Sequence, residues 1–168
     1  MSNSSPYRIL GIDPGTATTG FGIIDTSISK VSQVVDYGVI TTEAHLSDSK
    51  RLAIIDNSLK ELINTYKPNN LAVEKLFFFR NTTTIITVAQ ARGVVLLNAE
   101  IHNLQLFEFT PLQIKQAITG YGKAPKSQMQ EMVATILGLK SIPKPDDAAD
   151  GLAVALCCQS SLGYLLKT

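Results

Sequence analysis

Three short apolar stretches near the start of the chain point to three strands. Apolar residues and glycines dominate residues 8–13, 19–25 and 34–40, and turn-forming or polar residues separate these stretches. Pro14 and Gly15 stop the first stretch, as such residues commonly do in turns. Short runs joined by tight turns predict three consecutive antiparallel strands.

After residue 48 the spacing of apolar positions changes to that of a helix. Residues 49–66 place five apolar side chains on one helical face: Leu52, Ile55, Leu59, Leu62 and Ile63. Strands and helices then follow one another: a strand over 71–74, a helix over 83–102, a strand over 104–109, and helices starting at 110, 127 and 147. Thr110, Pro111 and Gln113 have the spacing of a capped helix start.

This order of elements predicts an α/β fold. A meander of strands followed by strand–helix units favours a mixed, five-stranded central sheet with helices on both faces. The chain has 168 residues, 45% of them hydrophobic and 17% charged, which is enough apolar material for a buried core. No linker or repeat divides it, so we expect residues 1–168 to form a single domain.

Composition narrows the class of protein. The two cysteines, Cys157 and Cys158, are adjacent, which gives neither a disulfide framework nor a zinc site. No apolar run approaches the length of a membrane span, about 18 residues, and the polar N-terminus lacks the pattern of a secretory signal. We therefore expect a cytoplasmic protein with no membrane partner.

The charge distribution is more informative than the net charge of +1. Residues 75–126 carry six basic and only two acidic side chains. Such a local surplus indicates one basic face of the kind that binds nucleic acid. An ordinary solvated surface explains the surplus equally well.

Two carboxylates end strands that are otherwise apolar. Asp13 follows Ile9–Ile12, and Glu74 follows residues 71–73. A buried, ionised carboxylate is costly unless it has a partner or a metal ion. If the two strands are parallel neighbours, both side chains project at the same edge of the sheet, where ligand sites gather in open α/β sheets.

Two further carboxylates belong to the last predicted helix. Asp147 and Asp150 are three residues apart, on one face of its first turn, where the helix dipole favours anions. Four carboxylates that provide only oxygen ligands suit Mg²⁺ or Mn²⁺ and not zinc. Two such ions can activate a water and stabilise the leaving oxygen of a phosphodiester.

Each carboxylate also has a plain structural explanation. Asp13 before Pro14-Gly15 is a common turn acid, Glu74 could pair with Arg80 or Arg92, and the two late aspartates could cap a helix. Taken together, the four are harder to explain in this way.

Ordered motifs along residues 8 to about 160 resemble those of the RuvC family of Holliday-junction resolvases. They are Ile9–Gly15 with Thr19–Gly22, Ala72–Glu74 with Phe77 and Arg80-Asn81, Gln90–Gly93, Gln113–Gln116, Lys126–Met129, and Asp147–Asp150 with Leu152-Ala153. One departure is Gly151, where the family often has Ala, and we expect it to cost about 1 kcal/mol of helix propensity. Another is the run Phe77–Phe79, where the family has one aromatic residue.

The resemblance implies a ribonuclease-H-like fold and a homodimer that cuts four-way DNA junctions by symmetric paired nicks in recombination and repair. It implies Mg²⁺ as cofactor, with Mn²⁺ as a substitute, and the RuvA–RuvB branch-migration complex as partner. Asp13, Glu74, Asp147 and Asp150 fall on the family's catalytic, metal-binding carboxylates. The expected DNA-binding residues are Phe77, Phe78, Arg80, Lys115, Lys123 and Lys126.

The homodimer also follows from symmetry, because a two-fold junction that is cut on two strands calls for a two-fold enzyme. The helix over 83–102 carries Ile86, Ala89, Gly93, Val94 and Leu97 on one side. Since Gly93 permits close approach, we expect this helix to form the interface.

Other classes of protein share parts of this pattern. Residues 11–16 resemble the first phosphate loop of actin-like ATPases and sugar kinases, but those proteins need two lobes. A non-catalytic DNA-binding module would not need all four carboxylates. A nuclease of the same fold for another structured DNA remains an alternative, because junction choice depends on dimer geometry.

Overall fold

A five-stranded mixed sheet forms the centre of the molecule. The computed structural model describes residues 7–27, 30–76 and 82–165. The strands are β1 (Tyr7–Asp13), β2 (Thr18–Ser27), β3 (Lys30–Thr41), β4 (Asn70–Glu74) and β5 (Gln105–Phe109). Their order is β3-β2-β1-β4-β5, with antiparallel pairing in the β1–β2–β3 meander and parallel pairing of β4 with β1 and β5. The predicted mixed sheet is confirmed.

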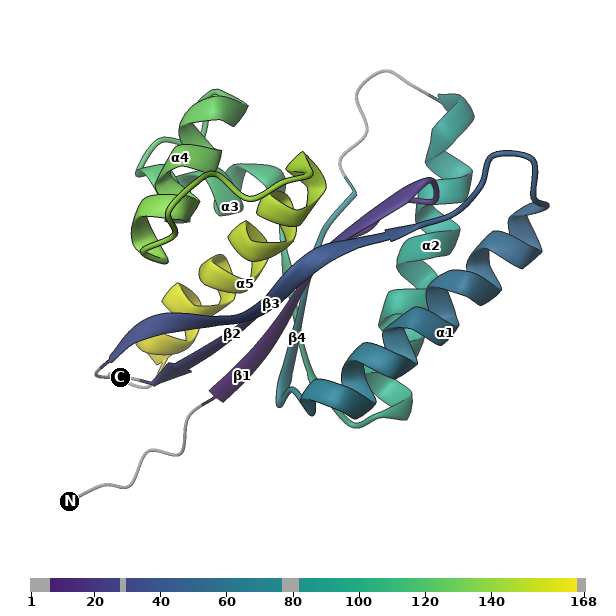
Figure 1. Cartoon of the computed structure of the whole chain (residues 1–168), viewed down its shortest axis with the longest axis horizontal. Coiled ribbons are helices and arrows are strands. Elements are labelled where there is room, and N and C mark those ends of the chain that lie inside the picture. The colour runs from purple at the N-terminus through teal and green to yellow at the C-terminus, as the bar shows by residue number, and fades with distance from the viewer. Residues whose placement is uncertain (1–6, 28–29, 77–81, 166–168) are drawn as a thin grey trace.

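Helices cover both faces of this sheet, as expected (Figure 1). They are α1 (Asp48–Tyr66), α2 (Thr82–Ile101), α3 (Pro111–Thr119), α4 (Lys126–Ile136) and α5 (Asp146–Leu165). In Figure 1, α1 and α2 lie on one side of the sheet, and α3, α4 and α5 lie on the other. The start of α3 has the expected capping box: Thr110 accepts from the Gln113 amide, and Gln113 accepts from the Thr110 amide.

The core consists of two clusters separated by the sheet. Alternate residues of each strand point to opposite faces, so Leu10 and Ile12 pack with α1 and α2, whereas Ile9 packs towards α5. On α1 the predicted face is confirmed at Ile55, Leu59 and Ile63, which are all buried. The meander strands are longer than predicted, because β3 continues past a bulge to Lys30 with polar residues that the apolar pattern does not reveal.

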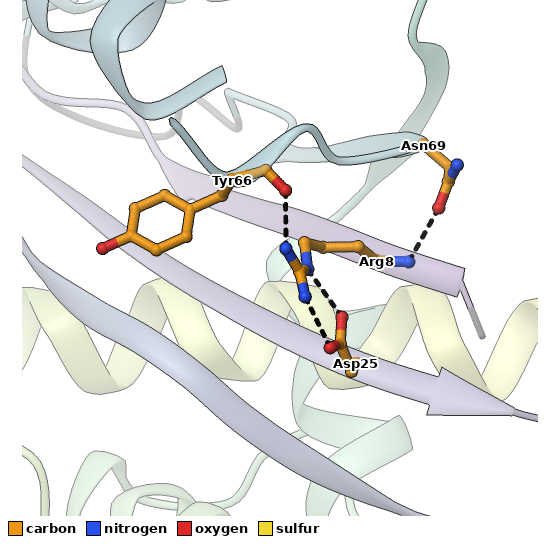
Figure 2. A network of polar contacts seen from close by, with 4 residues as sticks. All are labelled: Arg8, Asp25, Tyr66 and Asn69. Atoms are coloured by element: carbon orange, nitrogen blue, oxygen red, sulfur yellow. Dashed lines mark hydrogen bonds and ion pairs between the residues drawn. The ribbon is translucent and has the colours of Figure 1, made fainter. Parts of the chain in front are cut away.

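A polar network fixes the end of β1 that lies away from Asp13 (Figure 2). The Arg8 guanidinium binds both carboxylate oxygens of Asp25 on β2, each at 2.7 Å, and donates to the carbonyl oxygen of Tyr66 at the end of α1, also at 2.7 Å. The Arg8 amide donates to Asn69 Oδ1 at 2.9 Å. Bidentate pairs of this kind are geometrically specific. Arg8 therefore fixes β1 against both β2 and the end of α1.

Glycines let α5 lie directly on the sheet. Gly11 of β1 is opposite Gly22 of β2, and both face α5. A Cβ on Gly22 would lie 2.6 Å from the Leu152 Cα, and one on Gly151 would lie 2.5 Å from the Phe21 carbonyl carbon. The expectation that Gly151 only weakens the helix is therefore incomplete: it is a close-packing position at which a side chain would collide with β2.

The α2 helix is less buried than a core helix. Its buried residues are Ala91, Val95, Asn98 and Ala99, whereas Ile86, Leu97 and Ile101 are 66%, 56% and 57% exposed. Residues 84–101 have a mean hydropathy of 1.2, and 22% of them are buried. By length and composition this helix could cross a membrane, so the expectation that no run is long and apolar enough was wrong.

Candidate metal centre

Asp13 and Glu74 end two neighbouring parallel strands. In the β1–β4 ladder Ile12 is opposite Val73, and the next residue on each strand is the carboxylate. Both side chains are half-buried. They lie on the α5 side of the sheet, because Ile9 and Ala72, an even number of residues earlier, pack in the α5 cluster.

The first turn of α5 brings two more carboxylates to this edge. One carboxylate oxygen from each of Asp13, Asp147 and Asp150 lies within 4.8 Å of the other two. Gly20, opposite Asp13 on β2, makes this approach possible, because a Cβ there would overlap the Asp147 carbonyl oxygen. Asp146, the first residue of α5, stays outside the group and pairs with Lys144 at 2.8 Å.

The electrostatics of the group favour a cation. Burial first, and then the charges of Glu74, Asp150 and Asp147, together raise the pKa of Asp13 to about 9. Burial is also the main cause of the raised pKa of Glu74 and of Asp150. A cation bound among these carboxylates would favour their ionised forms and lower their raised pKa values.

Two lysines reach the same place from α3 and α4. Glu74, Asp150, Lys115 and Lys126 line one cleft of about 190 Å³. Lys126 Nζ lies 2.8 Å from Asp150 Oδ2. Burial acts to lower the pKa of Lys126, but the bond to Asp150 and the charges of the other aspartates outweigh it and raise the pKa.

Of the other expected DNA-binding residues, the structure describes only Lys123. Lys123 is exposed in the loop between α3 and α4 and does not line the cleft. Phe77, Phe78 and Arg80 lie outside the described residues, as does Phe79. Arg92 does not pair with the Glu74 side chain: its guanidinium binds Glu108 and reaches only the Glu74 carbonyl oxygen.

A larger cavity of about 390 Å³ lies between β3 and α1, lined by Phe21, Val39, Glu61 and Tyr66 among others. It contains one carboxylate, Glu61, and none of the predicted site residues. The predicted site residues therefore lie apart from this cavity.

Sequence reasoning missed two contributors to this site. Gly20 gives α5 room at Asp147, and Arg92 braces the end of β4. A signal for the first was present, because Gly20 and Gly22 are two residues apart and so lie on one face of a strand. The partner of Arg92 depends on which strand lies beside β4, which the local pattern does not give.

Comparisons with known proteins agree with this geometry. The family model described as "Crossover junction endodeoxyribonuclease RuvC" matches residues 9–158. The RuvC of Fusobacterium nucleatum is 52% identical over 160 residues, covering 95% of this chain and 84% of that protein. The RuvC of Rubrobacter xylanophilus is 55% identical over 157 residues, covering 94% of this chain and 87% of that protein.

Solved structures show the same fold. Thermus thermophilus RuvC in complex with a Holliday junction substrate superposes with a TM-score of 0.88 at 31% identity, covering 94% of this chain and 96% of that one. The yeast mitochondrial Holliday junction resolvase Ydc2 has a TM-score of 0.68 at 16% identity, covering 97% and 83% of the two chains, which extends the likeness of fold.

Proposed function

The chain belongs to the RuvC family of crossover junction endodeoxyribonucleases, and we infer from this that it hydrolyses phosphodiester bonds in four-way DNA junctions. The observation that carries this function is the cluster of three carboxylates from Asp13, Asp147 and Asp150 at the end of β1. The chain that holds this cluster matches a junction-bound relative over nearly its whole length. We propose that residues 1–168 form one nuclease domain that acts in recombination and repair.

We propose that Asp13, Glu74, Asp147 and Asp150 hold Mg²⁺, for which Mn²⁺ can substitute. The donor set fits a hard cation, since it offers only carboxylate oxygens. Asp150 Oδ1 supports this assignment, because it is buried and has no hydrogen-bond partner among the described residues. When bound, such ions lower the pKa of a water and stabilise the charge on a leaving oxygen.

The protein's own side chains then position the scissile phosphate. Lys115 and Lys126 are the cations that line the cleft with Glu74 and Asp150. Lys126 holds Asp150 by an ion pair, and an incoming phosphodiester would offer its ammonium group a second anion. We propose that both lysines stabilise the charge that develops on the phosphate in the transition state.

The assignment of the remaining DNA-contacting residues rests on the sequence. Phe77, Phe78 and Arg80 follow β4 directly, a few residues after Glu74, and Lys123 lies in the exposed α3–α4 loop. We propose that the aromatic residues stack on bases unpaired at the crossover and that Arg80 and Lys123 bind backbone phosphates.

We propose a homodimer formed through one face of α2. Ile86, Leu97 and Ile101 are more than half exposed, and a Cβ on Gly93 would meet no atom within 4 Å. An exposed apolar stripe of this kind marks a contact surface. A second copy, related by a two-fold axis, would cover the stripe and present two cleavage sites to a two-fold junction.

The setting of the activity is a further proposal. A nuclease that resolves chromosomal junctions acts where the DNA is, so we place the protein in the cytoplasm, with the RuvA–RuvB branch-migration complex as its partner by family resemblance. The apolar face of α2 then meets a second copy and not a lipid bilayer.

A cleavage assay tests the function. The protein is incubated with a labelled four-way junction, a linear duplex and a forked duplex of the same sequences, with Mg²⁺ or with EDTA. Paired nicks in the junction alone, abolished by EDTA, are expected. Equal cutting of the fork would favour a nuclease for other structured DNA, and binding without cutting would favour a non-catalytic module.

A further inference from the structure

Arg92 joins three elements next to the metal centre. It lies in the middle of α2, and its side chain is 19% exposed. Its Nε donates to the carbonyl oxygen of Glu74 at 3.3 Å, and its Nη2 forms an ion pair with Glu108 of β5. One guanidinium thus ties α2 to the carboxyl ends of β4 and β5.

The end of β4 has few other donors available. β1 continues from Asp13 into Pro14, which has no amide hydrogen. Beyond the end of β5, the Thr110 amide donates to Gln113 Oε1, and the next residue is Pro111. The Lys75 amide donates to the Phe109 carbonyl oxygen. Among the described residues, this is the last backbone hydrogen bond between β4 and β5. The Glu74 carbonyl therefore depends on a side chain.

Arg92 and the Glu74 carboxylate lie on opposite faces of the sheet. Glu108 alternates with Phe107 and Phe109, which face α5, so Arg92 and Glu108 meet on the α2 face. The Glu74 side chain points to the α5 face. Arg92 therefore reaches this residue through its peptide group alone, and fixing that peptide fixes the direction of the Glu74 side chain.

We propose that Arg92 is a positioning residue, held by Glu108, that fixes the end of β4 and thereby sets the Glu74 carboxylate for metal binding. This role rests on the metal site under the proposed function and adds a residue to it. Partners that orient metal ligands typically contribute about 10–100-fold to metal affinity or activity. A direct role in DNA binding is less consistent with a guanidinium that is already ion-paired and mostly buried.

The test measures metal binding without DNA. Titration calorimetry with Mn²⁺ is performed on the full-length wild type, Arg92→Ala, Arg92→Lys and Glu108→Gln. Lys60→Ala is the control, because it breaks an ion pair with Asp56 at 2.5 Å on α1, away from the strand ends. Junction affinity in EDTA and thermal unfolding are measured on the same samples.

We expect Arg92→Ala to weaken Mn²⁺ binding about 10-fold, with Arg92→Lys and Glu108→Gln intermediate. Junction affinity in EDTA should stay unchanged, and Lys60→Ala should bind Mn²⁺ like the wild type. Unchanged Mn²⁺ affinity in Arg92→Ala, even with lower thermal stability, would overturn the proposal, as would an equal loss of junction affinity. If Arg92→Ala does not fold, Glu108→Gln decides by the same criteria. Failure of the wild type itself to bind Mn²⁺ would instead reject the metal site on which the proposal rests.

Discussion

Gly20 of β2 and Asp147 of α5 meet backbone to backbone, with no room for a side chain between them. Gly20 is also the cross-strand partner of Asp13. The same contact that seats the first turn of α5 on the sheet therefore brings an aspartate of that turn next to the strand-end carboxylate.

Gly20→Ala should damage both stability and metal binding. The added methyl group would push α5 away from β2, and overpacking of this kind costs about 1–3 kcal/mol. Urea unfolding and Mn²⁺ titration measure the two effects. Gly22→Ala is the matched control, because its methyl group would meet Leu152 instead of an aspartate. Both variants should lose stability, and Gly20→Ala should lose more Mn²⁺ affinity. Equal affinities would show that this contact does not position Asp147.

Asp13→Asn should stabilise the metal-free protein at neutral and alkaline pH. The pKa of Asp13 is about 9 in the folded state, against an ordinary value of 3.8. The folded protein thus keeps a proton that the unfolded chain releases, so this group's contribution to stability falls as pH rises from about 4 to about 9. The slope is at most about 1.4 kcal/mol per pH unit. The measurement is urea unfolding in EDTA at several pH values. Parallel curves for the two proteins would contradict this prediction.

Lys126→Ala should slow cleavage far more than it weakens binding. Loss of one group that stabilises transition-state charge commonly costs about 10²–10³-fold in rate. Single-turnover cleavage and junction affinity separate the two effects. Lys123→Ala is the control, because that exposed lysine lies outside the cleft. It should lower affinity and its salt dependence with little change in the cleavage rate. Similar behaviour of the two variants would remove the special role of Lys126.

Leu97→Glu should convert the proposed dimer to a monomer, because it places a charge in the exposed apolar stripe of α2. Leu112→Glu is the matched control: Leu112 is 60% exposed, close to the 56% of Leu97, but lies on α3. Sedimentation velocity should give the mass of one chain for Leu97→Glu and of two chains for Leu112→Glu. A dimer that survives Leu97→Glu would place the interface elsewhere.

The strand and helix pattern was sufficient to predict the fold, since the continuous apolar runs of β1 and β4 are buried on both faces of the sheet and α3 begins at its capping box. It also placed Asp13 and Glu74 at strand ends, because both interrupt apolar runs. The closeness of α5 was not predictable in the same way. It depends on Gly11, Gly20, Gly22 and Gly151, whose missing side chains matter only once the facing element is known.

The two sides of α2 show a second limit. Apolar residues surround this helix, so spacing alone does not separate Ala91 and Val95, which pack on the sheet, from Ile86 and Leu97, which do not. The ion pair between Arg92 and Glu108 was also not predicted, because the sequence suggested Glu74 as a partner of Arg92. Glu108 comes close to the end of β4 only through the parallel pairing of β4 with β5.

The decisive experiment on the four-carboxylate metal site is anomalous diffraction at the manganese absorption edge, from crystals grown with Mn²⁺ and a four-way junction carrying an uncleavable linkage. We expect an anomalous peak within bonding distance of carboxylate oxygens from Asp13 and at least one of Glu74, Asp147 and Asp150, with the scissile phosphate beside it. A protein bound to its junction with no peak at these residues, or with manganese only elsewhere, would contradict it.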